Sequence, residues 1–384
     1  MGLMSWLPQR QRPRPATTTT VLFGDVRTGR IYDTLDVTGC SWQQVINDAG
    51  RIDGVIVEGH EVRKKKLRQA AHAARTFLAV DVDGVIQEAG PIWSRPWDDE
   101  RQQLTLGANG LWSLFDHRKA LDAFSTGQRV QDSAITLTGA DFGGIGYGLL
   151  LNAVNTPGGS LPLYAAAPTA GARTETFPGW QLMWIGDQLR QLTKRQNGPD
   201  IRFRPTYSPD RLSVQWWYEA GTEERPLLTQ VGDDWFFDAS VPKSPVVNIH
   251  TDEDATVMGM RSWVTGEGQE QDILMASAYD PTLVDAGWPL LEVDETRSTV
   301  SDQATLDGHA ANLRDRSARP IEVWKVVVRA EAAAQVQAGD YARVIPRRNH
   351  PWLGDGEAYM RIKSKSGDMG SNVTLEMYAV QAAV

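Results

Sequence analysis

Residues 77–86 read Phe-Leu-Ala-Val-Asp-Val-Asp-Gly-Val-Ile, an apolar run that turns at Asp83-Gly84 and continues in Val85-Ile86. An Asp-Gly pair between two β-rich runs is the strongest short-range signal for a β-hairpin. The stretch therefore predicts two antiparallel strands. A doubly wound parallel sheet would need a crossover helix after the first strand. Residues 90–91 read Gly-Pro and lead into another β segment, so the stretch favours a β-rich fold.

Short β segments surround this hairpin between residues 21 and 115. Residues 91–95 and 102–106 predict a second antiparallel pair, joined by a charged loop at 98–101. Residues 62–75, which contain three consecutive lysines and several alanines, are the best helix candidate of the region. We expect residues 21–115 to form a β-rich domain, preceded by an extended arm over residues 1–20.

The pattern changes between residues 116 and 245. Residues 140–155 and 180–196 carry apolar residues at helical spacing, and Leu182, Ile185, Leu189 and Leu192 predict one face of the second helix. Strands are expected at 201–203 and 212–217. This region therefore predicts a small α+β module.

β signals return from residue 246 to the end of the chain. A helix is expected over 301–317, where apolar residues recur at helical spacing. The expected strands cover residues 257–264, 273–279, 323–328, 341–345, 359–362 and 373–377. Short strands with regular turn signals predict a barrel or a sandwich over residues 246–384.

The composition excludes several classes of protein. Hydrophobic residues make up 41% and charged residues 23% of the 384-residue chain, which is typical of a folded globular protein. Its 48 acidic and 39 basic residues give a net charge of −9, which argues against gripping nucleic acid or anionic lipid through a basic surface. Cys40 is the only cysteine, so no intramolecular disulfide and no multi-cysteine metal site can form.

The sequence shows no targeting or anchoring signal. No apolar run approaches 18 residues, and residues 1–14 lack the apolar core of a signal peptide. We therefore expect no membrane anchor. The protein is expected to stay in the cell where it is made, or to leave by a route that needs no signal.

One segment resembles an enzyme motif. An apolar strand ending in Asp81-Val82-Asp83-Gly84 resembles the first motif of haloacid-dehalogenase phosphatases, where the first Asp attacks phosphorus and the second is the general acid and base. Residues 232–238 contain acidic residues that could supply the magnesium motif. Because that chemistry needs a doubly wound parallel sheet, we interpret the segment as a hairpin.

Other catalytic patterns are equally weak. The acidic groups at 98–100 and at 219, 223 and 224 could supply paired carboxylates of a glycosidase, but the 14 tryptophans are scattered and gather around neither group. The six histidines (60, 72, 117, 250, 309 and 350) show no metal-ligand spacing, and the glycines of 143–148 match neither phosphate-binding motif. We predict no catalytic, cofactor-binding or metal-binding residues, and no enzyme.

Three stretches together resemble a known family. They are residues 21–50, with Phe23-Gly-Asp-Val-Arg-Thr-Gly-Arg-Ile-Tyr-Asp-Thr-Leu35 and Ser41-Trp42-Gln43; residues 83–118, with Pro91-Ile92-Trp93-Ser94-Arg95 and Leu111-Trp112-Ser113-Leu114-Phe115; and residues 339–377, with Gly339-Asp340-Tyr341 and Pro351-Trp352-Leu353. Their order is similar to that in minor tail proteins of long non-contractile-tailed actinobacterial phages, which are similar to the baseplate (tail-tip) hub proteins of other phages.

The resemblance implies a β-rich α+β protein with two tube-like β-barrel domains and an α+β module between them. It implies a structural virion protein of the tail tip, assembled in the host cytoplasm as a homotrimeric ring. Such a ring docks onto the hexameric distal tail protein, encloses the tape measure C-terminus, carries tip or receptor-binding proteins and lets DNA pass. No cofactor and no specific nucleic-acid binding are implied. Three copies would carry roughly −27 (3 × −9), which suits a conduit for DNA.

Trp and Arg dominate binding energy at protein interfaces, so Trp93, Arg95, Trp97, Trp216 and Trp217 are our interface candidates. On a strand, Trp216 and Trp217 must point to opposite faces, so at most one of them fills the module's own core. The alternative function is a cell-wall-active or carbohydrate-binding tail-tip protein that uses tryptophans as glycan platforms.

Overall fold

The computed structural model describes residues 18–122, 127–166, 170–195, 197–268, 270–298 and 300–380. The chain divides into two compact units: unit 1 is Met1–Asn248 and Val326–Glu376, and unit 2 is Ile249–Lys325 and Met377–Val384. Strands β15 (Val246–Asp254) and β19 (Ile321–Arg329) carry the chain from unit 1 to unit 2 and back. This division differs from the predicted ranges 21–115, 116–245 and 246–384, which stay a prediction. Residues 1–17 of the predicted arm lie outside the described residues.

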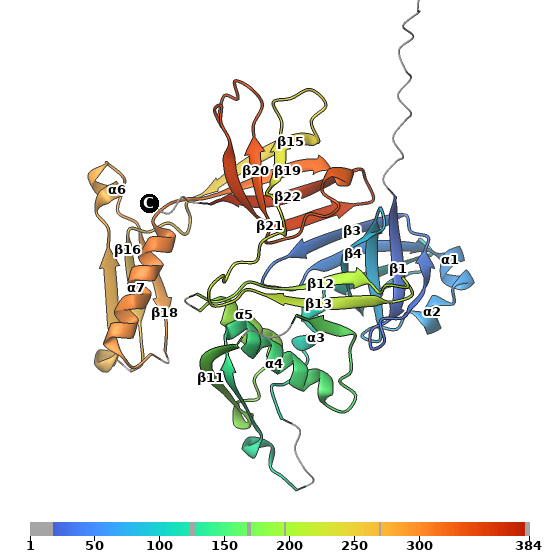
Figure 1. Cartoon of the computed structure of the whole chain (residues 1–384), viewed down its shortest axis with the longest axis horizontal. Helices are drawn as coiled ribbons and strands as arrows, with labels where there is room; N and C mark the ends of the chain where they lie inside the picture. The colour runs from blue at the N-terminus through green and yellow to red at the C-terminus, as the bar shows by residue number, and fades with distance from the viewer. Residues whose placement is uncertain are drawn as a thin grey trace, which may run out of the picture. The chain divides into compact units, whose positions relative to one another are not determined.

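Unit 1 is built on one large, mainly antiparallel sheet (Figure 1). Its first strands are β1 (Thr19–Asp25), β2 (Ile31–Leu35), β3 (Gly39–Val45), β4 (Arg51–Glu58), β5 (Thr76–Val82), β6 (Val85–Ser94), β7 (Trp97–Asp98) and β8 (Gln103–Asn109). Its last strands are β14 (Trp235–Asp238), β20 (Tyr341–Ile345), β21 (Ala358–Asp368) and β22 (Asn372–Ala379).

The sheet joins the two ends of the chain. Its strands follow the order β15-β19-β22-β21-β3-β4-β8-β6-β5-β1-β2, and β21 pairs antiparallel with β3 from Ser364↔Val45 to Asp368↔Ser41. Figure 1 shows the red β21 beside the blue β3. The β-rich α+β class is confirmed. The described strands form no closed barrel, so the two predicted barrels remain a proposal.

The predicted hairpin at residues 77–86 is confirmed. β5 and β6 pair antiparallel with Val82 opposite Val85, and the turn residues Asp83 and Gly84 have φ of 53° and 86°. Two consecutive positive φ values are what a two-residue hairpin turn requires. All seven residues of β5 are buried, which explains its nearly unbroken apolar sequence.

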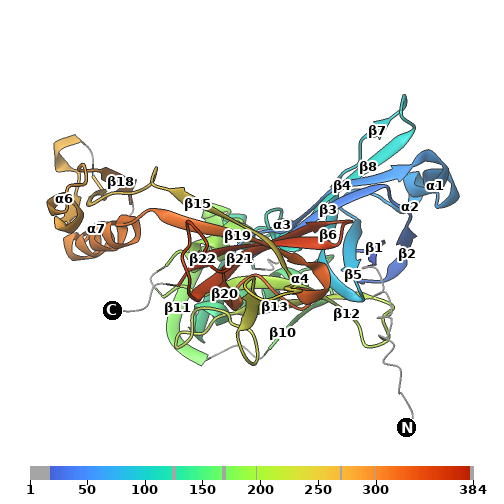
Figure 2. The ribbon, with the colours of Figure 1, turned by 90° about the horizontal axis from the view of Figure 1, so that it is seen from above.

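The helix predicted over residues 62–75 is wrong in its extent. Two short helices, α1 (Gly59–Lys64) and α2 (Leu67–Ala70), occupy the region, and Lys66 between them has a left-handed φ of 52°. Figure 2 shows them beside β8, near β7. Because Leu67 is completely buried, its packing outweighs the helix propensity of the lysines and alanines around it.

The α+β module packs on the same unit. It consists of α3 (Trp112–Phe115), β9 (Ala134–Ala140), α4 (Phe142–Asn155), β10 (Leu163–Ala165), β11 (Ala170–Pro178), α5 (Ile185–Thr193), β12 (Ile201–Tyr207) and β13 (Val214–Ala220), with single 3₁₀ turns at Val130–Asp132 and Gly179–Gln181. In α4 the glycines allow close packing, since a Cβ on Gly146 would lie 2.4 Å from the Tyr218 hydroxyl. That close approach confirms the interpretation of the Gly-rich segment.

The helix predicted over 180–196 begins later than expected. Ile185, Leu189 and Leu192 are buried on one face as predicted, but Leu182 is 46% exposed and has φ of 46°. Gly179 to Gln181 form a separate 3₁₀ turn whose carbonyl at Gly179 accepts the Leu182 N–H. The periodicity was correct for the helix, but the left-handed turn takes Leu182 out of it.

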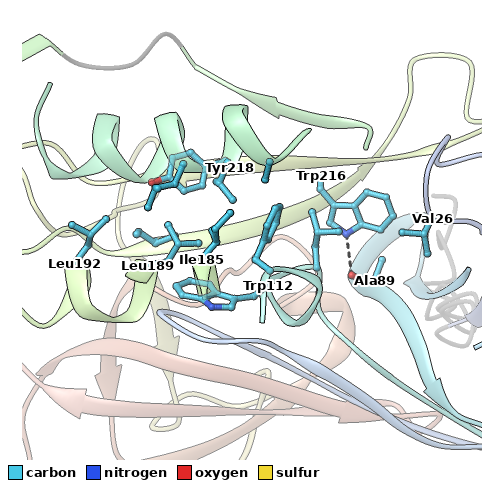
Figure 3. Close-up of a cluster of buried hydrophobic side chains, with 14 of the residues drawn as sticks. Val26, Ala89, Trp112, Ile185, Leu189, Leu192, Trp216 and Tyr218 are labelled. Atoms are coloured by element: carbon cyan, nitrogen blue, oxygen red, sulfur yellow. Dashed lines mark hydrogen bonds between the residues drawn. The ribbon is translucent and has the colours of Figure 1, made fainter. Parts of the chain in front are cut away.

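One hydrophobic core joins the first β region to the module (Figure 3). Trp216 on β13 lies at its centre, 0% exposed, and its indole N–H donates to the Ala89 carbonyl oxygen at 2.9 Å. The Trp216 ring meets Phe77 edge to face at 5.6 Å between centroids. The helix α5 contributes Leu189 from the other side. The predicted split of the tryptophan pair is confirmed, since Trp217 is only half-buried.

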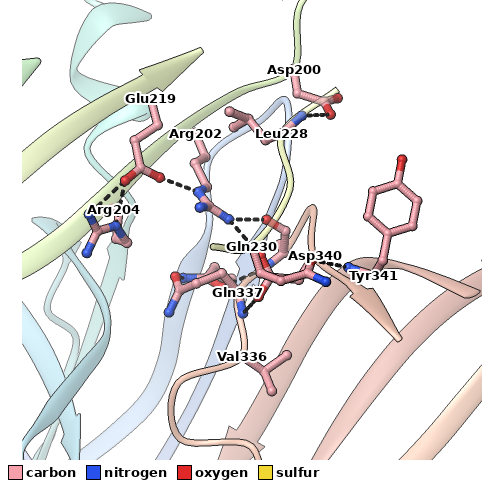
Figure 4. A network of polar contacts seen from close by, with 12 residues as sticks. Asp200, Arg202, Arg204, Glu219, Leu228, Gln230, Val336, Gln337, Asp340 and Tyr341 are labelled. Carbon is pink, nitrogen blue, oxygen red and sulfur yellow. Dashed lines mark hydrogen bonds and ion pairs between the residues drawn. The ribbon is translucent and has the colours of Figure 1, made fainter. Parts of the chain in front are cut away.

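Polar side chains bind the C-terminal strands to the module and to β3 (Figure 4). The Arg202 guanidinium donates to Glu219 at 2.5 Å and to the Ala338 carbonyl at 2.7 Å, and lies 3.6 Å from Asp340. Gln44 of β3 contacts the same turn, since its oxygen accepts the Ala338 N–H at 2.9 Å. Each buried charge in this network therefore has an opposite charge or a hydrogen-bond partner.

A second buried ion pair lies beside the network around Arg202. The carboxylate of Asp200 pairs with Arg361, accepts the Leu228 N–H at 2.9 Å and accepts the Asn47 side-chain amide at 2.9 Å. The Asp200 and Arg361 side chains are 5% and 6% exposed. The contact brings together residues 161 positions apart in the sequence.

Lys365 is a buried lysine on β21. Its Nζ donates to Gln87 Oε1 at 2.6 Å, to the Val336 carbonyl at 3.0 Å and to the carbonyls of Ala333 and Ala334. Burial lowers the pKa of Lys365 to about 7, and the negative charge of Asp340 opposes this shift. The side chain holds the turn at residues 333–336 against β6.

Glu88 makes the stability of unit 1 depend on pH. Burial raises the pKa of Glu88 from 4.5 to about 8. Because the folded-state pKa is the higher one, its contribution is fully present below about pH 4.5 and is lost as the pH rises through 8. Between roughly pH 5 and pH 7 we expect the unfolding free energy of the wild type to fall by about 2 kcal/mol more than that of Glu88→Gln. Urea unfolding at both pH values measures this difference, and parallel changes in the two proteins would show that Glu88 does not bind the proton.

Unit 2 is a three-stranded sheet covered on one face by a helix (Figure 1). Its elements are β16 (Arg261–Thr265), a 3₁₀ turn (Glu270–Asp272), β17 (Met275–Tyr279), α6 (Thr282–Asp285), β18 (Glu292–Thr296) and α7 (Gln303–Ser317). The strands are ordered β17-β16-β18, with β17 antiparallel and β18 parallel to β16. Leu306, Ala310 and Leu313 of α7 pack on Val264 and Ala276, which confirms the helix predicted over 301–317.

The negative charge of the chain is concentrated in unit 2. Residues 249–325 contain 15 acidic and 6 basic residues, a net charge of −9, and residues 377–384 carry no charge. The whole chain has 48 acidic and 39 basic residues, which leaves 33 of each in unit 1. Unit 1 is therefore neutral overall. None of the described helices is long and apolar enough to cross a membrane.

Candidate functional site

The residues that resemble a phosphatase motif serve the hairpin. Asp81 accepts the Gly84 N–H at 2.7 Å and the hydroxyl proton of Tyr207, while Asp83 accepts the Thr18 N–H at 2.8 Å. Antiparallel pairing of β5 with β6 replaces the strand-helix-strand unit that phosphoryl transfer on this motif requires. The interpretation of these aspartates as turn residues is confirmed.

The candidate glycosidase carboxylates are engaged by arginines or lie in a loop. Glu219 accepts from Arg202 and from Arg204, and Glu223 accepts from Arg173 at 2.8 Å. Asp98 is the last residue of β7, and residues 99 and 100 lie in the turn that joins β7 to β8. In the described part of the chain, no group of three or more His, Cys, Asp or Glu side chains could hold a metal ion.

The structure separates the predicted interface residues. The Trp216 side chain is completely buried in the core of unit 1. Trp217, on the other face of β13, is half-buried and stacks on Tyr164 of β10 at 5.6 Å between ring centroids. Of this pair, only Trp217 retains surface that another molecule can contact.

The other three candidates follow one another along β6 and β7. Trp93 donates its indole N–H to Ser113 at 2.8 Å and lies against the His117 ring. Arg95 donates to the carbonyl of Ala71, the C-cap of α2, at 2.9 Å. Trp97 is 42% exposed. Arg95 and Trp97 therefore lie together, with one anchored and the other open to solvent.

Arg95 and Trp97 line a groove of about 570 Å³ between the two short helices and β8. Its other lining residues are Gly59, Val62, Arg63, Lys66, Leu67, Arg68, Gln69 and Leu104. An apolar floor and an exposed indole between four basic side chains are the chemistry of a protein-binding groove that accepts an acidic, partly apolar segment. We call it the Trp97 groove.

The break between α1 and α2 positions the basic side chains of this groove. In a continuous helix over 62–75, Arg63 and Lys66 would share a face, and Arg68 would point to another side of the helix. Instead α1 ends at Lys64, the left-handed Lys66 precedes α2, and Arg63, Lys66 and Arg68 all line the same groove. The sequence showed the cluster of basic residues at 63–68. No local pattern predicted the helix break at Lys66.

A second exposed apolar site was missed by the sequence analysis. Trp180, Leu182 and Trp184 are 67%, 46% and 39% exposed within five residues, between β11 and α5. Lys119 lies over the Trp184 ring at 3.2 Å from its centroid. Two tryptophans four positions apart were a usable signal, but only Leu182 between them was assigned, and it was assigned to the buried face of a helix. Exposed apolar side chains gathered in this way mark interaction surfaces.

Two solved structures share this fold over nearly the whole chain. The first is the 43 kDa tail protein of prophage MuSo2 from Shewanella oneidensis, with a TM-score of 0.56, 11% identity, and coverage of 94% of this chain and 98% of that one. The second is a tail protein from Neisseria meningitidis MC58, with a TM-score of 0.55, 14% identity, and coverage of 95% and 97%. This chain has the fold of these two tail proteins. At such low identity the likeness establishes the fold alone.

No protein-family model and no curated protein sequence matches the chain. The shared tail-protein fold extends over both units, since each alignment covers more than nine-tenths of this chain. It agrees with the coarse form of the resemblance found in the sequence, a phage tail protein. The restriction to actinobacterial phages with long non-contractile tails remains a proposal.

Proposed function

We propose that this chain is a structural protein of a phage tail tip, a baseplate hub without catalytic activity. The observation that carries the proposal is the full-length likeness to two tail proteins, one of them from a prophage, each of which is also covered almost end to end. The residue types that first indicated enzymes serve a hairpin turn and ion pairs, which supports a structural role.

The finer proposal is a ring of three copies that closes the tail tube. Each chain would supply two tube-like β domains, one from strands β1–β8 and one from the C-terminal strands. The large sheet of unit 1 supports this idea, since it joins both sets of strands through the β21–β3 pair. The proposed partners are the hexameric distal tail protein, the tape measure C-terminus and tip or receptor-binding proteins, with DNA passing through the lumen.

The charge distribution changes the expectation for that lumen. Three copies of the chain carry a net charge of roughly −27. Because unit 1 is neutral, a ring wall built from unit 1 would not carry this charge. A conduit built from unit 1 would avoid trapping DNA by neutrality, while the acidic surface would be confined to three copies of unit 2.

The Trp97 groove is the proposed contact of the ring. Trp97→Ala is expected to raise the dissociation constant of the assembly by at least about tenfold, since truncating a hot-spot tryptophan of an interface costs about 2 kcal/mol or more. Trp97→Phe keeps an aromatic ring in the groove and should retain most of the affinity. Mass photometry over a dilution series measures both, and equal dissociation constants for Trp97→Ala and the wild type would exclude the groove from the contact.

The location in the virion is tested by labelling. An antibody against the chain, attached to gold and imaged on phage particles that encode it, should decorate the end of the tail opposite the capsid. Gold on the capsid or along the tail shaft, or particles that lack the chain, would contradict a tail-tip role.

A further inference from the structure

A ring of three copies requires two different contact surfaces on each chain. Contact between two identical grooves would be isologous and would stop at two copies. In a ring of three, one surface of each chain meets a different surface of the next chain. If the Trp97 groove is one of these surfaces, the chain has to carry a second surface that fits the groove. Because the groove is basic and partly apolar, that second surface has to be acidic and partly apolar.

The groove carries basic side chains that are available to another molecule. Arg63, Lys66 and Arg68 are exposed, and no carboxylate within the described ranges pairs with them. Arg95, in contrast, donates to two backbone carbonyls at α2. The exposed Trp97 ring lines the same groove. A carboxylate close to an apolar side chain would therefore find both a cation and a ring to contact.

The loop before β14 projects an acidic and apolar segment. Val231 is completely exposed, and it is followed by Gly232, whose φ of 99° turns the backbone, and by the exposed Asp233. In the described part of the chain, no ion pair or hydrogen bond engages the Asp233 carboxylate. We call residues 231–233 the Val231 loop. It belongs to unit 1, as the groove does.

Hydrogen bonds on both sides fix the Val231 loop to the sheet (Figure 4). The Gln230 side chain donates to Asp234 at 2.8 Å and accepts the Tyr341 N–H at 2.8 Å. Asp234 also accepts from Arg343 at 3.3 Å. Because the residues before and after the loop are held on β20, little conformational entropy is lost when the loop docks.

The sheet separates the Val231 loop from the groove of the same chain. Strands β20, β21 and β3 lie between β14, which follows the loop, and β4, which leads into α1. Four strand spacings correspond to about 19 Å along the sheet. A loop that is fixed at both ends does not cross this distance, so a Val231 loop that meets the groove has to come from another copy.

We propose that the Val231 loop of one copy docks in the Trp97 groove of the next copy. Val231 packs on the Trp97 ring, and Asp233 pairs with Arg68. Each chain supplies one loop and one groove, so the same contact repeats around the ring and leaves neither surface unused. The inference rests on the proposed ring of three copies and names the two surfaces that hold it together.

Cross-linking of engineered cysteines tests this contact. Cys40 is the only cysteine, and burial raises the pKa of its thiol to about 12, so it stays unreactive. Full-length Val231→Cys is mixed with full-length Gln69→Cys, which places a thiol in the groove, and a short bismaleimide is added. A covalent two-chain product should form in the mixture and with neither variant alone. Val130→Cys, the same change at another exposed valine of unit 1, should give no product with Gln69→Cys.

The mass of the unmodified chain distinguishes failure of this contact from failure of the ring. A species of three chains in analytical ultracentrifugation, without the mixed cross-linked product, would overturn docking of the Val231 loop and leave the ring intact. The mass of one chain at every concentration would contradict both. Equal yields with Val130→Cys and Val231→Cys would show random collision and would also overturn the contact.

Charge reversal tests the ion pair of the contact. Asp233→Arg should raise the dissociation constant of the assembly at least about tenfold, because it places a like charge against Arg68. Adding Arg68→Asp to the same chain should restore the constant to within about threefold of the wild type. Glu253→Arg makes the same change of charge in unit 2 and should alter the constant by less than about twofold. Equal weakening by Asp233→Arg and Glu253→Arg, or no recovery in the double variant, would overturn the pairing.

Discussion

Replacing Asp200 with asparagine is expected to lower the unfolding free energy of unit 1 by about 3–5 kcal/mol. The substitution keeps the size of the side chain but leaves the Arg361 guanidinium buried beside a neutral amide. It also weakens the acceptor of the Leu228 N–H and the Asn47 amide. Urea unfolding followed by tryptophan fluorescence should show a lower midpoint with an unchanged slope.

A surface pair provides the matched control for this substitution. Arg51 and Asp53 lie 3.4 Å apart with side chains 62% and 53% exposed, so Asp53→Asn should change the unfolding free energy by less than about 1 kcal/mol. In the double variant Asp200→Asn with Arg361→Met, the loss should be smaller than the sum of the single losses. Additive losses, or equal effects at Asp200 and Asp53, would contradict the buried pair.

Trp216→Ala is expected to cost about 3–5 kcal/mol as well, for a different reason. The indole is completely buried in the core that joins the first strands to the module, and its removal leaves a cavity beside Phe77. The Ala89 carbonyl also loses its donor. Trp216→Phe should cost less than the alanine variant, since it fills part of the cavity.

The neighbouring tryptophan is the control for the core. Trp217→Ala removes a half-buried ring that stacks on Tyr164, and we expect a loss of about 1 kcal/mol. Urea unfolding of the two alanine variants under the same conditions gives the comparison. A larger loss for Trp217→Ala than for Trp216→Ala would reverse the assignment of the two faces of β13.

The sequence predicted elements whose signals are local. Asp83-Gly84 fixes a turn through its own backbone preferences, and the α7 helix follows from apolar residues at helical spacing with Asp302 as its N-cap. The same holds for the strands of residues 201–207 and 214–220, which flank a Ser-Pro-Asp turn. For these elements tertiary packing agrees with local preference, so sequence alone was sufficient.

Long-range packing explains what the sequence could not predict. The break at Lys66 and the turn at Leu182 depend on packing by residues distant in the sequence, and the propensities of their own segments favoured continuous helices. The Asp200–Arg361 pair joins residues with no visible pattern in common. The Trp97 groove was half predicted: Arg95 and Trp97 were chosen as interface residues, but nothing local placed them beside the basic cluster.

The mass of the full chain in solution tests the proposed ring most directly. Analytical ultracentrifugation at micromolar concentration should give a species of three times the mass of one chain, which dissociates on dilution and more readily in Trp97→Ala. A single species with the mass of one chain at every concentration would contradict the proposed trimeric hub.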